Sequence, residues 1–576
     1  MASAPDPGRR QSGSTAGDEI LPPGPQEGVR PGRTLGLAVL GALIIFTSAA
    51  TTRIQEVPLS AQLGLLQVLP PGYWLGLGLI GASLAWSLRC RSEKLTVLTG
   101  VLFFAIFAGT GSLFLPHPPV WDAYSHFGRA QDIALGRLPS SPQEYAANWP
   151  GFFLNVRFLE ALTGLPPILI ISIFPFLTAG VTYLCLFLFL RTLTSPSRAG
   201  VGATLASLLN VWAQYWIAPQ SFGLFLAFLV LATMWRREPA ARVANAILFL
   251  GLVVTHPTST VLLLTVLFAD LGLSQIRRVL HRDQAARDGS EGGFPHNPAI
   301  TYGIVWLGWL FLRATGSAST VTTTLFSRIG LILRVPEQTV NLATQRTVEN
   351  LYFWPPLIRI AALFVYFLVG IRALIWLWKG RGSQRLAQVL AAMIGGLVLV
   401  AFADILAFGG ELYDRSLMLF AAIAPVICLA GLGRRRMQPK VRVAVIAALV
   451  AASLVTASTA LYLASFYYVS GESMAASNFL QRVDPESTVL DGLYPVPVWI
   501  PPEKRISPSQ PGFYEVYPRR FSDFGGPLPV YAVFDGTATL WYRQLRGIES
   551  YRPYAADRFN YPLIYDNGKV QVHLIN

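Results

Sequence analysis

The sequence predicts an all-α polytopic membrane protein with about 13 transmembrane helices, followed by a small C-terminal α/β or mainly β domain outside the membrane. Three observations support this fold class. Apolar residues make up 53% of the 576-residue chain and charged residues only 13%, with a mean hydropathy of +0.47, which a soluble protein of this length could hardly bury. Apolar runs long enough to cross a bilayer, roughly 17 to 25 residues, recur along most of the chain. Pro, Tyr, Asp and Gly replace Leu and Ala after residue 465.

The first 34 residues are rich in Pro, Gly, Ser and charge and contain no apolar core of a signal peptide. We therefore expect residues 1–34 to form a disordered tail. Apolar runs begin directly after it, and the two that flank His256-Pro257 could also be one broken element. We place the spans at 35–52, 72–88, 95–115, 167–190, 200–217, 220–235, 243–255, 257–274, 299–312, 357–378, 386–408, 416–433 and 443–465.

Basic residues fall mainly on one side of these spans. That side holds 24 of the 45 Lys and Arg residues, while the short loops on the other side hold very few. The positive-inside rule therefore places the N-terminus in the cytoplasm, and an odd number of spans places the C-terminal segment outside. Two long loops, 116–166 and 313–356, share that outer face. The net charge of +14 reflects this asymmetry, so we expect membrane lipids as partners and no nucleic acid.

The outer C-terminal segment, 466–576, contains short patterns typical of both helix and strand. "GESMAASNFLQRV" has amphipathic helical spacing, and "STVLDG" is typical of a strand. "LIYDNGKVQVHLI" indicates two strands joined at Asn567-Gly568, because this dipeptide favours the left-handed backbone of a tight hairpin. The three cysteines lie outside the long polar segments, so no disulfide framework or zinc site is predicted.

A polar cluster in "HPPVWDAYSHFGRAQDIALGRLP" (117–139) directly follows the third predicted span. Its apolar residues recur at spacings of three and four, which predicts a helix lying in the membrane interface with Trp121 and Tyr124 at headgroup depth. Asp122 would lie at or near the N-terminus of this helix, where the macrodipole favours a carboxylate. Asp122 is therefore either a helix cap or a functional group. His126 lies one helical turn later on the same face.

Several stretches, taken in order, resemble the GT-C superfamily of multi-span glycosyltransferases. "VWDAYSHFGRAQDIALGRLP" is similar to the first long outer loop of these enzymes, where an acidic residue leads into a juxtamembrane helix. "NWPGFFL", "THPTS" (255–259), "ELYDRSLMLFAAIAP" (411–425) and the C-terminal "RFNYPLIYDNGKVQVHLI" continue the resemblance. It spans 95–576, with 95–465 as the membrane core and 35–94 as two additional N-terminal helices. The WWDYG-like motif of oligosaccharyltransferases is absent, so transfer to protein Asn is not expected.

The resemblance implies transfer of a sugar, hexosyl or pentosyl, from a polyprenyl-phosphate donor to a hydroxyl of a glycan, lipid or protein, on the outer face of the plasma membrane. This reaction needs a base for the acceptor proton and a positive group for the departing phosphate. The resemblance implies Asp122 as the base, Arg415 as the principal phosphate ligand, and Arg129 and Arg137 as secondary ones. Further side chains expected at the substrate cavity are His126, Tyr124, Trp121, His256, Glu411, Asp414 and Asp404.

The same residues leave alternatives open. Arg415 could instead pair with a neighbouring acid, and His126 and His256 could have structural roles. No cofactor is predicted; a divalent metal stays open, because the first loop offers only Asp122 before Asp132. A transporter or flippase for lipid-linked sugars, a polysaccharide polymerase or ligase using a lipid-diphosphate donor, and a non-catalytic scaffold are the competing functions.

Overall fold

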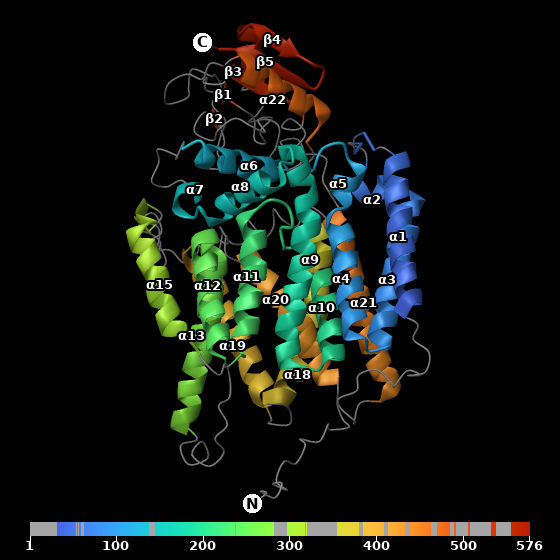
Figure 1. The fold of residues 1–576 in the computed structure, drawn as a ribbon, viewed down its shortest axis with the longest axis vertical. Coiled ribbons are helices and arrows are strands. Elements are labelled where there is room, and N and C mark those ends of the chain that lie inside the picture. Colours follow the sequence, from blue (N-terminus) through green and yellow to red (C-terminus); the bar gives the residue numbers. More distant parts are fainter. Residues whose placement is uncertain are drawn as a thin grey trace, which may run out of the picture.

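The computed structural model forms a bundle of roughly parallel helices with a small sheet at one end (Figure 1). We call the end that carries this sheet the upper end, as it is drawn in Figure 1. Apart from a few single positions, the described residues are 31–136, 145–280, 297–319, 354–378, 384–407, 413–432, 438–461, 469–483, 489–490, 505–506, 531–536 and 555–575.

Six helices among the described residues are long and apolar enough to cross a membrane. They are α1 (Pro31–Thr51), α9 (Pro167–Leu193), α13 (Pro257–Leu280), α18 (Trp354–Trp378), α20 (Tyr413–Leu432) and α21 (Pro439–Ser458). The other bundle helices are α3 (Pro71–Arg89), α4 (Glu93–Ala108), α5 (Thr110–Phe114), α10 (Pro196–Leu209), α11 (Pro219–Thr233), α12 (Pro239–Thr255), α15 (Ala299–Leu312) and α19 (Gln384–Ala407), and the short α2 (Leu65–Val68) precedes α3.

Each of the thirteen predicted spans overlaps one of these helices, or, for 95–115, the consecutive pair α4 and α5. The helical class is therefore confirmed, and the chain is a multi-pass membrane protein by the length and composition of its helices. Prolines explain many of the boundaries, because α3, α9, α10, α11, α12 and α21 each have proline at a first-turn position. The exact number of crossings and their orientation stay predictions.

Burial distinguishes the centre of the bundle from its edge. The most apolar windows of α9 and α20 are 67% and 78% buried, whereas those of α1 and α18 are 22% buried. The two N-terminal helices α1 and α3 pack closely where Gly41 faces Gly76, since a Cβ at either glycine would lie 2.5 Å from the carbonyl oxygen of the other. They therefore form a tightly packed pair, and their status as an N-terminal addition stays a prediction.

Three further helices lie across the upper end of the bundle (Figure 1): α6 (Trp121–Ala134), α7 (Tyr145–Asn148) and α8 (Gly151–Thr163). They share a buried aromatic cluster that includes Tyr124, Phe127, Phe152 and Phe153. The predicted helix after the third span is confirmed, but Tyr124 does not lie at an exposed headgroup surface. It is completely buried and its hydroxyl donates to the Pro118 carbonyl, because α8 and α9 cover the face of α6 that we expected to meet lipid.

The C-terminal domain is of the α/β type. Helix α22 (Gly471–Val483) packs on a five-stranded sheet ordered β2-β1-β3-β5-β4. The strands are β1 (Val489–Leu490), β2 (Arg505–Ile506), β3 (Tyr531–Asp535), β4 (Leu563–Asp566) and β5 (Val570–Leu574), with β1 parallel to β2 and β3 and the other pairs antiparallel. The predicted helix, first strand and final hairpin are all confirmed, and Gly568 has the positive φ, 89°, that the turn requires.

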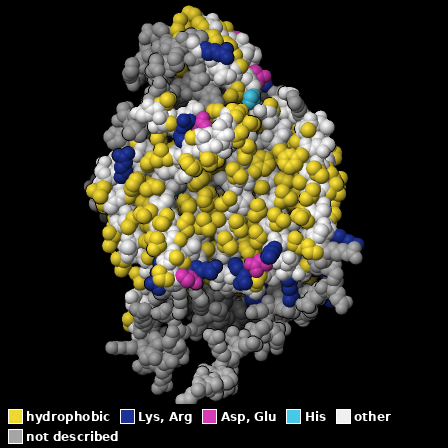
Figure 2. Space-filling view, viewed as in Figure 1, with side chains coloured by type: hydrophobic (Ala, Val, Ile, Leu, Met, Phe, Trp, Pro, Cys, Tyr) yellow, Lys and Arg dark blue, Asp and Glu magenta, His cyan; other side chains and the backbone are white. Residues whose placement is uncertain are grey.

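The surface of the bundle agrees with a membrane location. Figure 2 shows hydrophobic side chains covering the middle of this face, with Lys and Arg gathered along its lower margin. Many bundle residues with large apolar side chains are exposed, including Leu43 on α1, Ile304 on α15 and Phe364 on α18. Such a continuous apolar band is too large for a water-exposed monomer, so lipid is its natural environment.

Candidate functional site at the upper end of the bundle

The site is built around a break between α12 and α13. His256 lies between the two helices with φ −151° and ψ 110°, because Pro257 lacks an N–H and disfavours helical backbone in the residue before it. The sequence allowed either two helices or one broken element here; the structure has two helices meeting at His256. Hydrogen bonds within the break satisfy the polar groups of His256. The Ser259 backbone N–H donates to His256 Nδ1 at 3.2 Å, and Thr260 Oγ1 donates to the His256 carbonyl at 2.9 Å.

A glycine lets the neighbouring helix approach this break. A Cβ at Gly223 of α11 would lie 2.6 Å from Ser259 Oγ and 2.9 Å from His256 Cβ. Both neighbours are almost completely buried, so a larger residue at 223 would push α11 away from the break. Gly151, at the start of α8, makes a similar approach to Thr255 from above, with 3.0 Å between its Cβ position and Thr255 Oγ1.

Asp122 lies in the first turn of α6, but it does not cap that helix. The N-cap is Val120, and no side chain makes a cap hydrogen bond there, so the cap interpretation is wrong in geometry. The Asp122 side chain is 30% exposed, and its Oδ2 lies 3.3 Å from His126 Nε2. Trp216 Nε1 donates to the same Oδ2 at 3.4 Å. Among the described residues, no donor bonds Oδ1 of Asp122.

The electrostatics of Asp122 differ from those of a strong base. Burial raises the pKa of this carboxyl, but His126, the Trp216 hydrogen bond and the positive charge of Arg129 together outweigh it and hold the pKa below its ordinary value. A carboxyl that acts as a strong base at neutral pH needs desolvation or a neighbouring acid to raise its pKa. The carboxylate instead stays ionised, and partners of Oδ2 stabilise the negative charge.

Two arginines come to the same place from different helices. Arg415, near the start of α20, donates from Nη1 to Thr258 Oγ1 at 2.9 Å, on the first turn of α13. Arg415 also interacts electrostatically with His256 and with the Tyr145 hydroxyl. Arg129 of α6 acts on both Asp122 and Tyr145.

The Tyr145 hydroxyl interacts electrostatically with both arginines. Burial raises the pKa of Tyr145, and the charges of Arg415 and Arg129 only partly offset this rise, so the hydroxyl keeps its proton. Its internal acceptor is the Thr255 carbonyl, at a long 3.4 Å. A neutral hydroxyl that feels the charge of two guanidinium groups is well suited to donate to an anion bound by them.

The structure thus brings together five of the residues that the sequence singled out: Asp122, His126, Arg129, His256 and Arg415. Tyr124 belongs to the core instead, and Asp404 is fully buried on α19. Arg137 and Glu411 lie outside the described residues, as do the side chains of Trp121 and Asp414, whose backbones belong to α6 and α20.

Trp216 and Tyr145 were not predicted as site residues. Trp216 follows α10 in a loop, 94 residues beyond Asp122, and Tyr145 reaches a carbonyl 110 residues away. No spacing in the sequence encodes such contacts, because the fold alone brings these segments together. A buried aromatic side chain with one polar atom was the only available signal, and it is shared by many of the 14 Trp and 21 Tyr residues.

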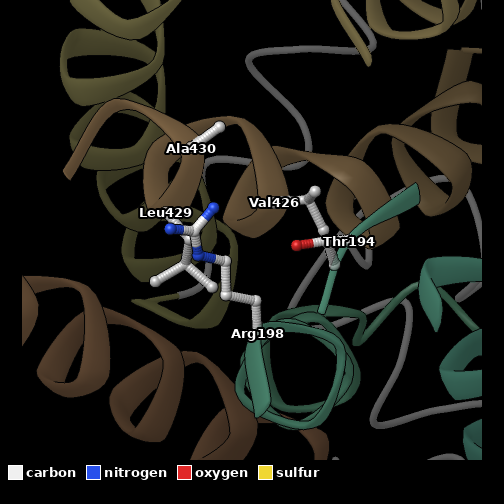
Figure 3. A pocket seen from close by; sticks show the side chains of 5 residues that line it. All are labelled: Thr194, Arg198, Val426, Leu429 and Ala430. Carbon is white, nitrogen blue, oxygen red and sulfur yellow. The ribbon is translucent and has the colours of Figure 1, made fainter. Parts of the chain in front are cut away.

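The described part of the chain contains no group of three or more His, Cys, Asp or Glu side chains able to hold a metal. A small cavity of about 10 Å³ does occur elsewhere, lined by Thr194, Arg198, Val426, Leu429 and Ala430 (Figure 3). Ala430 lies 15 residues after Arg415 on the same helix, roughly 20 Å along its axis. This cavity holds about one water molecule, so it is no site for a sugar.

In sequence, no protein-family model and no curated protein matches the chain. In structure, it is similar to the crystal structure of the Archaeoglobus fulgidus oligosaccharyltransferase, which was tethered through a disulfide bond to an acceptor peptide containing the NVT sequon. The match has a TM-score of 0.50 and 11% identity and covers 85% of this chain and 75% of the archaeal one. At this identity the likeness concerns the fold. The chain therefore shares the fold of this archaeal oligosaccharyltransferase, in agreement with the fold that the resemblance in sequence implied.

Proposed function

We propose that the chain transfers a sugar from a polyprenyl-phosphate donor to an acceptor hydroxyl at the upper end of the bundle. The observation that supports this most is the meeting of two kinds of group. The first is the Asp122 carboxylate, whose Oδ1 accepts no hydrogen bond from the described residues. The second is the pair Arg129 and Arg415: both interact electrostatically with the Tyr145 hydroxyl, and Arg129 interacts also with Asp122. A base and an anion site are the two parts this reaction needs.

Asp122 is the proposed base. In the reaction, the acceptor oxygen forms a bond to the anomeric carbon of the sugar while the bond from that carbon to the phosphate oxygen breaks. The acceptor proton moves to Oδ1 of Asp122, and the electron pair of the broken bond stays with the lipid phosphate. The low pKa of Asp122 makes it a modest base, so proton transfer is most favourable late, when the developing bond has made the hydroxyl acidic.

Arg415 and Arg129 are the proposed ligands of the departing phosphate. Guanidinium groups stay charged at any physiological pH and bind phosphate through paired N–H donors. Arg415 already has its Nη1 fixed by Thr258, so its remaining donors need little reorganisation on binding. The Tyr145 hydroxyl supplies a third, uncharged donor, and Arg137 stays a further candidate by sequence alone.

The remaining specifics follow from the topology predicted from the basic residues. The site would open on the outer face of the plasma membrane, where the headgroup of a polyprenyl-phosphate sugar lies at the depth of α6. A hydroxyl is the preferred acceptor over an amide nitrogen, since one carboxylate suffices to remove a hydroxyl proton. The acceptor is a glycan, lipid or protein hydroxyl.

Purified protein tested against a panel of polyprenyl-phosphate hexoses and pentoses, with cell-envelope glycans as acceptors, checks this function. We expect transfer from at least one donor, with release of the lipid phosphate in equal amount. Donor binding with movement of the intact lipid-linked sugar between leaflets, and no product, would instead support a transporter. Activity only with a diphosphate-linked donor would support a polymerase or ligase.

A further inference from the structure

We propose that His126 and Trp216 are positioning residues that hold Asp122 by its Oδ2 and thereby present only Oδ1 to the acceptor. The proposal rests on the proposed function, because it assigns the part that two further residues play at the same carboxylate. It concerns how the base is held, and neither residue touches the reacting atoms.

Both donors reach the same oxygen from different parts of the chain. His126 follows Asp122 by one helical turn, and its Nε2 lies 3.3 Å from Oδ2. Trp216 comes from the loop between α10 and α11, and its Nε1 lies 3.4 Å from Oδ2. A carboxylate held at one oxygen from two directions cannot rotate freely about its Cβ–Cγ bond. Oδ1 then keeps one direction without being bonded itself.

The loop that carries Trp216 is itself held on both sides. Thr178 Oγ1 of α9 donates to the carbonyl of Tyr215, and Ser221 Oγ of α11 donates to the Trp216 carbonyl at 3.4 Å. The backbone around the indole is therefore tied to two bundle helices. Such second contacts are what keep a functional side chain within the narrow range of geometry that catalysis needs.

The surroundings of His126 fix which of its nitrogens carries the proton. Because Asp122 is ionised, Oδ2 requires a donor, so Nε2 carries a hydrogen. Nδ1 of His126 is buried and has no hydrogen-bond partner among the described residues, while the ring packs against Phe152 and Phe153 with centroids 6.2 and 5.9 Å away. The nitrogen that faces the carboxylate, Nε2, is therefore the one that holds Asp122.

Paired variants separate positioning from general packing. His126→Ala removes the donor, and we expect turnover to fall roughly 10- to 100-fold with donor affinity changed by less than about twofold. His126→Gln keeps an N–H at a similar reach and should recover most of this loss. Trp216→Phe keeps the aromatic bulk and should lower turnover by roughly 3- to 10-fold. Equal losses in His126→Gln and His126→Ala, or losses that appear mainly in donor affinity, would contradict the proposal.

The decisive comparison repeats His126→Ala in an Asp122→Asn background. If His126 acts through the carboxylate, removing it should cost almost no further turnover once the base is gone. A residue that only stabilises the fold would lower turnover by the same factor in both backgrounds, and that result overturns the proposal. Thermal unfolding of all four proteins checks that each is folded at the assay temperature.

A readout that needs no turnover distinguishes failure of this inference from failure of the proposed function. The chain has six histidines, so ¹⁵N-histidine NMR of the full-length protein in lipid can assign His126 by its loss in His126→Gln. We expect a hydrogen on Nε2, bonded to the carboxylate, and a clear change in its signals in Asp122→Asn. An Nε2 without a hydrogen, or indifference to Asp122→Asn, would overturn the inference even in an active enzyme. The expected signals in a protein inactive with every donor would leave the hydrogen-bonded pair standing and refute the proposed function.

Discussion

Two aspartates, the half-buried Asp122 at the upper end of the bundle and the buried Asp270 inside it, have very different hydrogen-bonding environments. Asp270 of α13 is 1% exposed, and an amide bonds each of its oxygens: Gln388 donates to Oδ1 and Asn297 to Oδ2, both at 3.0 Å. These bonds connect α13 to α19 and to the start of α15. Asp122 receives both of its hydrogen bonds on one oxygen.

The difference shows how a structural carboxylate can be told from one available for chemistry. A buried group whose hydrogen-bonding capacity is filled from within the fold has no capacity left for a substrate. A carboxylate that is hydrogen-bonded at one oxygen and unbonded at the other gives up some folding stability, because the second oxygen lacks a hydrogen bond. A purely structural site would gain that stability by bonding both oxygens. By this criterion Asp122 fits the role of the proposed base, and Asp270 fits a structural role.

The largest expected effect comes from making the same substitution at both aspartates. Asp122→Asn keeps the size of the side chain but removes proton acceptance, so turnover should fall by roughly 100-fold or more while donor binding persists. Asp270→Asn should leave turnover within about twofold but lower the midpoint of thermal unfolding, because an amide nitrogen would face the donors of Asn297 or Gln388. Near-parental turnover in Asp122→Asn would end its assignment as the base.

The anion site should show the next largest effect. Arg415→Ala removes the charge and the Thr258 contact, and we expect donor affinity to fall by roughly 10- to 100-fold. Arg415→Lys keeps the charge without the fork of donors, so its loss should be smaller. Direct binding of the lipid phosphate measures both. If the two variants bind like the parent, Arg415 only connects α20 to α13.

Tyr145→Phe sharpens the comparison with a smaller change. It removes one uncharged donor that interacts with both arginines and leaves the ring packing against Trp149 and Phe153 in place. A donor affinity reduced by roughly 3- to 10-fold is expected, since the hydroxyl is replaced by nothing polar. The control is Tyr124→Phe, which removes a completely buried hydroxyl that donates to the Pro118 carbonyl and should leave donor affinity unchanged.

The smallest expected effect concerns pH. The pKa of Asp122 is lowered in the folded protein, so its ionisation favours folding at neutral pH, and this contribution is lost only as pH falls below the ordinary value of about 4. Between pH 8 and pH 5 the protonation of Asp122 should therefore contribute no loss of turnover. Turnover measured against pH checks this. A fall in turnover between pH 8 and pH 5 that is kept in His126→Gln but lost in Asp122→Asn would show that the Asp122 pKa is raised instead.

The sequence predicted much of this architecture and part of the site. Periodicity and apolar length located the helices, and the Asn567-Gly568 turn located the final hairpin, because these signals are local. Asp122 and His126 were paired by their spacing on one helix. Trp216 and Tyr145 could not be found in this way, since their contacts join segments about 100 residues apart. Tyr124 was misplaced because helical spacing shows that a helix has an apolar face without showing whether lipid or protein covers it.

Three helices that begin at the site also affect the electric field there. Helices α11, α13 and α20 all begin there: Gln220 of α11 donates to Met418 of α20, and Arg415 of α20 donates to Thr258 of α13. Each helix start contributes roughly half a positive charge from its aligned peptide dipoles. Gln220, Thr258 and Ser416 at these starts are buried, and salt screens buried charges less than it screens exposed lysines. An anion held at this point would therefore feel an attraction that depends less on ionic strength than that of a surface charge, and that removal of any single side chain would leave largely intact.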